Sequence, residues 1–271
     1  MPPSPRIPVV LSIAGSDSGG GAGVQADLKA FARCGVYGTT AITAITAQNT
    51  VGVEAVEAIS PEVIRAQVRA VASDIGVDAV KIGMVGGTEA IEAVAAALDA
   101  LPEGVPVVLD PVMIAESGAR LLPTDAQAAL RDSLVPRATV VTPNLPEARA
   151  LAEAGDEATT EELARAVHAL GAGYVVVTGG HRAEGTDLFF DGAQIVELAG
   201  EIHPDGAAHG SGCTHSSVLA ARLALGDDPL TAAREARRLA SEAVRDGLRE
   251  LGAGAGPVDV LGLGRGARTV P

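Results

Sequence analysis

Short runs of Val, Ile, Leu and Ala alternate with amphipathic stretches along almost the whole chain. Apolar runs bounded by turn residues predict strands at residues 8–14, 39–47, 79–82, 105–109, 139–142 and 174–177. Apolar positions at helical spacing predict helices over residues 22–34, 88–101 and 124–134, two more before residue 174, and others that begin at Ser60-Pro61, near Ser211 and near Pro229. Two further runs, 187–190 and 194–198, flank Asp191-Gly192 and predict a β-hairpin.

Strands that alternate with helices predict an α/β fold with a central, mostly parallel sheet and helices on both faces. No segment has the composition of a linker and no internal repeat is visible, so we expect one domain over residues 1–271, with flexible tails at 1–6 and 262–271. In open parallel sheets, ligands bind at the carboxyl ends of the strands. The loops that follow the predicted strands are therefore where a site is expected.

The composition disfavours some classes of function. Acidic residues number 34 against 20 basic ones, which gives a formal net charge of −14. Nucleic acids and anionic membranes both need a positive face, so neither is an expected partner. Two cysteines, Cys34 and Cys213, cannot form a disulfide framework, and the N-terminus lacks the charged-then-apolar order of a signal peptide. We therefore expect a cytoplasmic protein.

The loop after the first predicted strand is rich in glycine, from Gly15 to Gly23. Its end fits the dinucleotide-binding fingerprint, but the next strand ends in Gln48-Asn49, where that motif requires an acidic residue for the ribose. Residues 17–20 resemble the nucleophile loop of trypsin-like proteases, but all five histidines lie downstream, which is the wrong chain order. What remains is a loop whose backbone approaches a ligand at a helix N-terminus, or a plain turn.

Polar residues at other strand ends are candidates for a site. Gln48 offers both a donor and an acceptor, which suits the edge of an aminopyrimidine, although a turn cap has the same sequence. Asn144 and Glu147 stand three residues apart and face one side of a helical turn. They are candidates for a capping box or, with Asp110 at the end of its strand, for a magnesium–phosphate site.

Residues 209–214, His-Gly-Ser-Gly-Cys-Thr, lead into a predicted helix. A glycine-rich turn before a helix lets successive backbone N–H groups converge on an anion. Cys213 falls in the first turn, where the helix dipole is expected to lower the pKa of its thiol. The alternatives are a buried, inert cysteine and a zinc site with His203, His209 and His215, whose spacing does not fit structural zinc motifs.

Seven segments gain weight from their order along the chain. They are AGSDSGGGAGVQADLK (14–29), TAQNT (46–50), KIGM (81–84), DPVM (110–113), TPNLPE (142–147), GGH (179–181) and HGSGCT (209–214). In this order and near this spacing, they resemble the hydroxymethylpyrimidine/phosphomethylpyrimidine kinases of thiamine biosynthesis, in the ribokinase superfamily. Each segment is weak alone, and seven in register are specific.

The resemblance implies a ribokinase-like three-layer sandwich, with a central mostly parallel sheet, helices on both faces and a small lid. It implies a kinase that uses ATP and Mg²⁺ to phosphorylate the hydroxymethyl group of a thiamine-precursor pyrimidine, and then the monophosphate. It implies a pyrimidine site of Gly15, Asp17, Ala22, Asp27, Gln48, Met84 and Val112 and an anion hole of Gly210, Ser211, Gly212 and Cys213. It also implies nucleotide contacts by Thr178, Gly180 and His209, and a magnesium motif of Asp110, Asn144 and Glu147.

The chain departs from the family pattern at three positions. Thr178 stands where a Lys usually precedes Gly-Gly-His, and Glu116 stands where a Lys or another non-acidic residue is common. Ala208 replaces a Thr before the HGSGCT segment. These changes bear on nucleotide contacts more than on the fold, and Arg182 is a candidate to replace a lost cation.

By this resemblance we expect in-line transfer of the ATP γ-phosphoryl group to the hydroxymethyl oxygen, with Cys213 taking the hydroxyl proton. A pyridoxal or pyridoxine kinase is the nearest alternative, because related enzymes phosphorylate a hydroxymethyl group on a similar ring. A non-catalytic pyrimidine- or nucleotide-binding regulator is the second alternative. Analogy with relatives also leads us to expect a homodimer.

Overall fold

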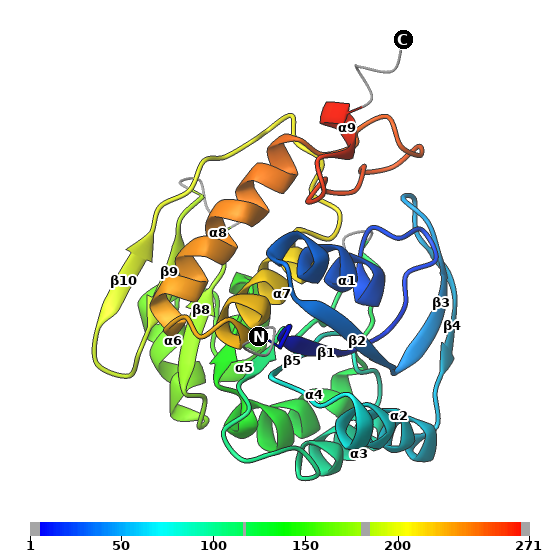
Figure 1. Cartoon of the computed structure of the whole chain (residues 1–271). Coiled ribbons are helices and arrows are strands. Elements are labelled where there is room, and N and C mark those ends of the chain that lie inside the picture. The colour runs from blue at the N-terminus through cyan, green and yellow to red at the C-terminus, as the bar shows by residue number, and fades with distance from the viewer. Residues whose placement is uncertain (1–5, 116–117, 180–184, 267–271) are drawn as a thin grey trace, which may run out of the picture.

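The computed structural model describes residues 6–115, 118–179 and 185–266. At its centre lies an eight-stranded sheet with the strand order β10-β9-β8-β7-β6-β5-β1-β2 (Figure 1). Its strands are β1 (Val9–Ala14), β2 (Tyr37–Ile42), β5 (Ala79–Ile82), β6 (Val107–Leu109), β7 (Val140–Val141), β8 (Tyr174–Val177), β9 (Asp187–Phe190) and β10 (Ile195–Leu198). Neighbours from β2 to β8 run parallel, whereas β9 is antiparallel to both β8 and β10. The predicted α/β class and the predicted hairpin are confirmed.

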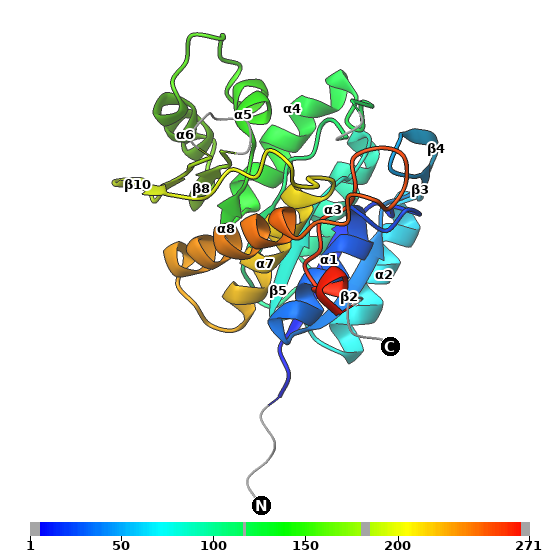
Figure 2. The same cartoon turned by 90° about the horizontal axis from the view of Figure 1, so that it is seen from above.

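Helices cover both faces of the sheet (Figures 1 and 2). One face carries α1 (Gly23–Cys34), α7 (Ser211–Ala224) and α8 (Pro229–Arg245). The other carries α2 (Pro61–Asp74), α3 (Thr88–Leu98), α4 (Gln127–Ala129), α5 (Leu145–Ala152) and α6 (Thr160–Ala169). The fold is therefore the expected three-layer arrangement.

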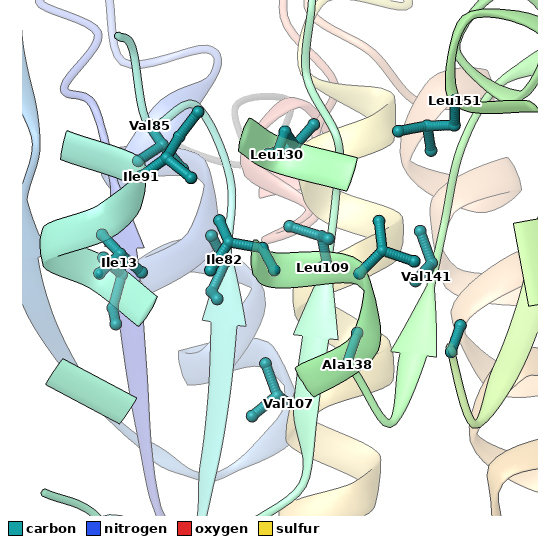
Figure 3. Packing of buried hydrophobic residues seen from close by; sticks show 14 of the residues in the cluster. Ile13, Ile82, Val85, Ile91, Val107, Leu109, Leu130, Ala138, Val141 and Leu151 are labelled. Carbon is teal, nitrogen blue, oxygen red and sulfur yellow. The ribbon is translucent and has the colours of Figure 1, made fainter. Parts of the chain in front are cut away.

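Two hydrophobic cores lie on opposite faces of the sheet, because successive side chains of a strand point to opposite sides. In β1, Val10 packs with α1, α7 and α8, while Leu11 and Ile13 pack under the helices of the other face. Figure 3 shows Ile13, Ile82 and Leu109 side by side from three neighbouring strands, beneath those helices. Aliphatic residues build these cores almost alone, as the 2% aromatic content requires.

The prediction of one strand over residues 39–47 is wrong. β2 ends at Ile42, and β3 (Ala44–Gln48) leaves the sheet to pair antiparallel with β4 (Val53–Ala58). Thr43 fixes the break, because its hydroxyl donates to the carbonyl oxygen of Met84 (2.7 Å). β4 was not predicted, since most of its residues are exposed and it contributes little to a core. This two-stranded sheet forms the expected small lid (Figure 1).

Two other differences from the predictions concern helices. The helix predicted over 124–134 is a succession of short turns, Thr124–Ala126, Gln127–Ala129, Leu130–Leu134 and Val135–Arg137, of 3₁₀, α, π and 3₁₀ type. The segment expected as a flexible tail contains a one-turn helix, α9 (Leu263–Gly266), whose first N–H groups bond to the Asp259 carboxylate. Within the described ranges, no helix has the length and apolar character needed to cross a membrane.

Candidate active site

The carboxyl ends of the parallel strands and the start of α7 surround a cavity of about 350 Å³. Nearly all residues predicted for the site line it: Gly15, Asp17, Ala22, Gln48, Met84, Asp110, Val112, Asn144, Glu147, Thr178, His209, Gly210, Ser211, Gly212 and Cys213. Gly180, together with Glu116 and Arg182, lies outside the described residues. Asp27 is described but lies behind the cavity wall. Segments from the whole length of the chain thus meet at one edge of the sheet.

Asp17 organises the glycine-rich loop after β1. Its carboxylate accepts hydrogen bonds from the backbone N–H groups of Gly19 (2.8 Å), Gly21 (3.0 Å) and Ala22 (2.8 Å). His209, predicted among the nucleotide contacts, places its Nε2 3.1 Å from Asp17 Oδ2. Burial alone would raise the pKa of Asp17, but the bonds that it accepts, that of His209 above all, hold the pKa below its usual value. Asp17 and His209 therefore join the first loop to the turn before α7.

The two glycine loops also touch through their backbones. Gly210 has a φ of 84°, and a Cβ there would overlap the carbonyl oxygen of Gly21. A Cβ at Gly21 would in turn overlap the His209 ring. Only glycine permits both the left-handed conformation and this close approach.

The start of α7 has the form of an anion cradle. Its first α-helical hydrogen bond runs from Thr214 N to Gly210 O (2.9 Å), and Ser211 N is already bonded to Ala208 O (2.9 Å). The N–H groups of Gly212 and Cys213 precede that first helical bond, and first-turn amides point out of the helix end. Within the described residues no side chain caps this helix. Gly212 and Cys213 are thus the amides of the predicted anion hole best placed to bind a phosphate.

The expectation that the helix start lowers the pKa of Cys213 is wrong. Burial raises the pKa of this thiol to about 12, and the carboxylates of Asp110 and Asp27 raise it further. Lys81 and a hydrogen bond from Gly23 N–H act in the opposite direction without prevailing. Desolvation of a thiolate at this half-buried position on the cavity wall therefore outweighs the contacts that favour it.

Lys81 and Asp27 form a fully buried ion pair behind the cavity. Lys81 Nζ lies 2.9 Å from Asp27 Oδ1, and both side chains are 0% exposed. The hydroxyls of Ser217 (2.7 Å) and Ser12 (2.5 Å) donate to the same carboxylate. Burial alone would lower the pKa of Lys81, but the charge of Asp27 more than reverses this effect. Lys81 lines the cavity and Asp27 does not. Asp27 can therefore influence a ligand only through its ion pair with Lys81.

Sequence reasoning assigned no role to Lys81. The signal was present, because a lysine in the apolar run Ala79–Ile82 is one of only two lysines in the chain. A charged residue in a buried strand requires a partner, and that partner is remote in sequence.

Gln48 reaches the cavity from the lid. The Thr46 hydroxyl lies 3.2 Å from Gln48 Oε1, and the backbone of Gln48 exchanges hydrogen bonds with the Ser18 hydroxyl (2.7 and 2.8 Å). These contacts hold the Gln48 amide at the rim and tie the lid to the first loop. Gln48 therefore lines the cavity at its rim, and its contact with a ligand stays a prediction.

Asn144 and Glu147 form the capping box of α5. Asn144 Oδ1 accepts from Glu147 N, and Glu147 Oε2 accepts from Asn144 N, both at 2.9 Å. Glu147 is nevertheless buried, and burial together with the charge of Asp110 raises its pKa to about 8. Burial likewise raises the pKa of Asp110, although Lys81 and the Ser216 hydroxyl oppose this shift. The capping-box interpretation is therefore confirmed. The box also holds the buried carboxylate of Glu147 where the charge of Asp110 acts on it.

Two buried carboxylates that repel each other suit a hard cation such as Mg²⁺, which takes oxygen ligands and keeps several waters. Within the described residues, no three His, Cys, Asp or Glu side chains are grouped as a metal site, so the zinc alternative has no support. His203 instead pairs with the Ser241 hydroxyl (3.0 Å).

Known proteins share this architecture. A family model described as phosphomethylpyrimidine kinase matches residues 17–259. A hydroxymethylpyrimidine/phosphomethylpyrimidine kinase of Rhizobium meliloti is 52% identical over 257 residues, which cover 92% of this chain and 96% of the relative. The ADP complex of Bacillus subtilis pyridoxal kinase has a TM-score of 0.86 at 38% identity, covering 95% of this chain and 99% of that chain. A phosphomethylpyrimidine kinase from Clostridium difficile has a TM-score of 0.74 at 38% identity, with 86% and 96% covered.

The sheet order, the two-stranded lid and the glycine-rich start of α7 define the fold as that of a ribokinase-like kinase. Within this class, the chain belongs to the phosphomethylpyrimidine kinase family.

Proposed function

We propose that this protein transfers the γ-phosphoryl group of ATP to the hydroxymethyl group of 4-amino-5-hydroxymethyl-2-methylpyrimidine, and then phosphorylates the monophosphate, in thiamine biosynthesis. The observation that carries the proposal is one cavity that combines a ring-sized apolar wall, a polar amide at its rim and a helix start with open amides. The names of the Rhizobium meliloti and Clostridium difficile relatives support the same substrates.

The ring is proposed to lie against Gly15, Ala22, Met84 and Val112, which line the cavity below the lid. Gln48 is the group proposed to bind the polar edge of the ring. The Thr46 hydroxyl donates to Ser16 O (2.8 Å), so both the NH₂ group and the oxygen of the Gln48 amide can bind groups on the ring edge. The hydroxymethyl group then points toward the start of α7.

The amides of Gly212 and Cys213 are proposed to bind the transferring phosphoryl group. Phosphoryl transfer depends mainly on positioning and on stabilising charge on the equatorial oxygens, and preorganised backbone N–H groups provide both. The Asp17–His209 pair and the contact between Gly21 and Gly210 hold these amides in fixed relation to the ring site.

Asp110 and Glu147 are proposed to hold Mg²⁺, and Asn144 positions Glu147 through the capping box. When bound, the ion neutralises charge on the phosphates. Burial and the charge of Asp110 together raise the pKa of Glu147 to about 8, and a bound cation would relieve the part that comes from repulsion between the carboxylates. We also propose that the protein works in the cytoplasm as a homodimer.

Cys213 is proposed to take the proton of the hydroxymethyl group as a thiolate. A thiol whose pKa is about 12 is almost entirely protonated at neutral pH, so the reactive form is a small fraction. Neutralisation of the nearby carboxylates enlarges this fraction, because Asp110 is one cause of the raised pKa of Cys213.

A pyridoxal kinase is the second candidate function. One observation supports it: the TM-score of the Bacillus subtilis pyridoxal kinase (0.86) is higher than that of the Clostridium difficile phosphomethylpyrimidine kinase (0.74). The two functions differ in the ring that the Gln48 side of the cavity accepts.

The test is a direct assay of phosphorylated products with ATP, Mg²⁺ and either the hydroxymethylpyrimidine, its monophosphate or pyridoxal. We expect the mono- and pyrophosphate of the pyrimidine, with pyridoxal turned over at least about tenfold less efficiently.

Gln48→Ala should raise the pyrimidine KM about tenfold or more, because the ring edge loses its partner. Val51→Ala is the control, since Val51 also lies in the lid but its side chain is 66% exposed and does not line this cavity. Faster turnover of pyridoxal would support the second function, and pyrimidine binding without product would indicate a regulator.

A further inference from the structure

A polar cluster that sequence analysis did not assign lies on the wall of the same cavity. It consists of Asp187 at the start of β9, His215 in the second turn of α7, and Arg237 in α8. The three side chains are 2%, 5% and 13% exposed. Charged and polar groups buried to this degree normally have hydrogen-bond partners.

Several atoms of this cluster lack partners among the residues that the structure describes. They are Asp187 Oδ2, both ring nitrogens of His215 and Arg237 Nε. His215 Nε2 lies 3.3 Å from Asp187 Oδ2, and Arg237 Nε lies 3.7 Å from Asp187 Oδ1, but neither approach is a directed hydrogen bond. Leaving such groups unpaired costs about 1–3 kcal/mol each, so the cluster is suited to a ligand that completes it.

Backbone contacts hold the side chains of the cluster in place, so that their unpaired atoms cannot turn to bond with one another. Asp187 Oδ1 is already occupied by the N–H of Gly179 (2.7 Å), and Arg237 Nη2 donates to Gly185 O. The Gly200 backbone packs directly on the guanidinium, where a Cβ would overlap it. The remaining donors and acceptors are therefore fixed at the cavity wall.

The chemistry of the free atoms selects the ligand group. Asp187 Oδ2 only accepts a hydrogen bond, whereas Arg237 Nε only donates one. A phosphate offers acceptors alone and would be repelled by the Asp187 carboxylate. A hydroxyl donates and accepts at once, and carboxylates hold ribose hydroxyls in dinucleotide-binding sites by the same chemistry.

We propose that Asp187, with Arg237 and His215 beside it, binds a ribose hydroxyl of the nucleotide substrate. The proposal rests on the proposed function, because it assumes that the nucleotide occupies this part of the cavity. Apolar side chains of Ile202, Ala240 and Val244 line the same cavity and offer a surface for the base. The site then distinguishes ribonucleotides from nucleotides that lack a sugar hydroxyl.

Calorimetric binding of ADP, 2′-deoxy-ADP and 3′-deoxy-ADP, with Mg²⁺ and without pyrimidine, tests this proposal. We expect at least one deoxy analogue to bind about tenfold or more weakly to the wild-type protein, because it leaves the cluster unpaired. Asp187→Asn, which keeps the shape but removes the charged acceptor, should reduce this discrimination to less than about threefold. Glu201→Gln is the matched control, because Glu201 also lines the cavity but its side chain is 81% exposed, and it should keep the wild-type discrimination.

Because Asp187→Asn leaves Arg237 without its counter-ion, the double variant Asp187→Asn/Arg237→Gln is measured beside it, with the melting temperature as a check of folding. Equal binding of all three nucleotides by the wild-type protein overturns the proposal, as does full discrimination by either folded variant. Nucleotide binding is read without turnover, so the two proposals fail separately. Discrimination without pyrimidine phosphorylation would contradict only the proposed function.

Discussion

Around Cys213, charges of both signs act on one thiol. Burial disfavours the thiolate most, the Lys81 ammonium favours it, and the carboxylates of Asp110 and Asp27 disfavour it. Lys81 is paired with Asp27 at 2.9 Å. The negative charge of Asp27 therefore partly cancels the effect of the Lys81 charge on the sulfur. The protonation state of this residue therefore depends on which of its acidic neighbours is neutralised.

Turnover is expected to rise with pH between about 6 and 9, because the thiolate fraction of Cys213 rises with pH below its raised pKa. Cys213→Ala should lower kcat by a factor of about 100 or more. Steady-state rates across this pH range check both statements, and Cys34→Ala is the control because Cys34 is the other described free cysteine. A near-normal rate in Cys213→Ala would leave the amides of α7 as the catalytic element.

Among the helices, α5 and α6 begin with the same device and use it differently. Asn144 and Glu147 cap α5, and Thr159 and Glu162 cap α6, each through reciprocal hydrogen bonds. Glu162 is exposed and its hydrogen bonds lower its pKa, whereas burial near Asp110 raises the pKa of Glu147. The cap of α5 thus holds a carboxylate in a place where it ionises with difficulty.

The stability of the Mg²⁺-free protein should fall as pH rises from about 5 to 8. Folded Glu147 keeps its proton up to a pKa of about 8, whereas the unfolded residue loses it near 4.5, so the folded state binds more protons between these values. Melting temperatures across this range measure the effect, and Glu147→Gln should flatten the profile. Glu162→Gln supplies the matched cap variant and should leave the fall in place. An unchanged profile in Glu147→Gln would place the titrating group elsewhere.

At the scale of the whole molecule, a segment near the C-terminus joins the lid to the turn before α7. Gly254 N donates to the Thr50 hydroxyl at the lid tip (3.2 Å), and Val258 N donates to His209 O (3.1 Å). Figure 1 shows this segment, in orange to red, beside the tip of the β3–β4 hairpin. The position of the lid is therefore set by residues about 200 positions further along the chain.

Gly254→Ala should displace the lid, because a Cβ at this position would overlap the carbonyl oxygen of Thr50. We expect the pyrimidine KM to rise about tenfold or more and the melting temperature to fall. Gly52→Ala is the control within the lid turn, since a Cβ there meets no atom within 4 Å. Wild-type kinetics in Gly254→Ala would show that the C-terminal contact does not position Gln48.

Most of the sheet and most of the cavity could be predicted from the sequence, because each strand end is marked by a short polar or glycine-rich motif. β4 could not be predicted, since a lid strand buries almost nothing and has no periodic pattern. The thiol pKa of Cys213 could not be predicted either, because it depends on side chains from three other segments. Asp187, His215 and Arg237 come from β9, α7 and α8, and only the folded chain brings them to one wall.

The contact between Asp17 and His209 couples the two sides of the cavity, so that ordering of one side is expected to order the other. Any ligand that orders one side pre-pays part of the ordering of the other, so the two substrates should assist each other's binding. Linkage requires this assistance to be mutual, by one and the same factor in either order of addition.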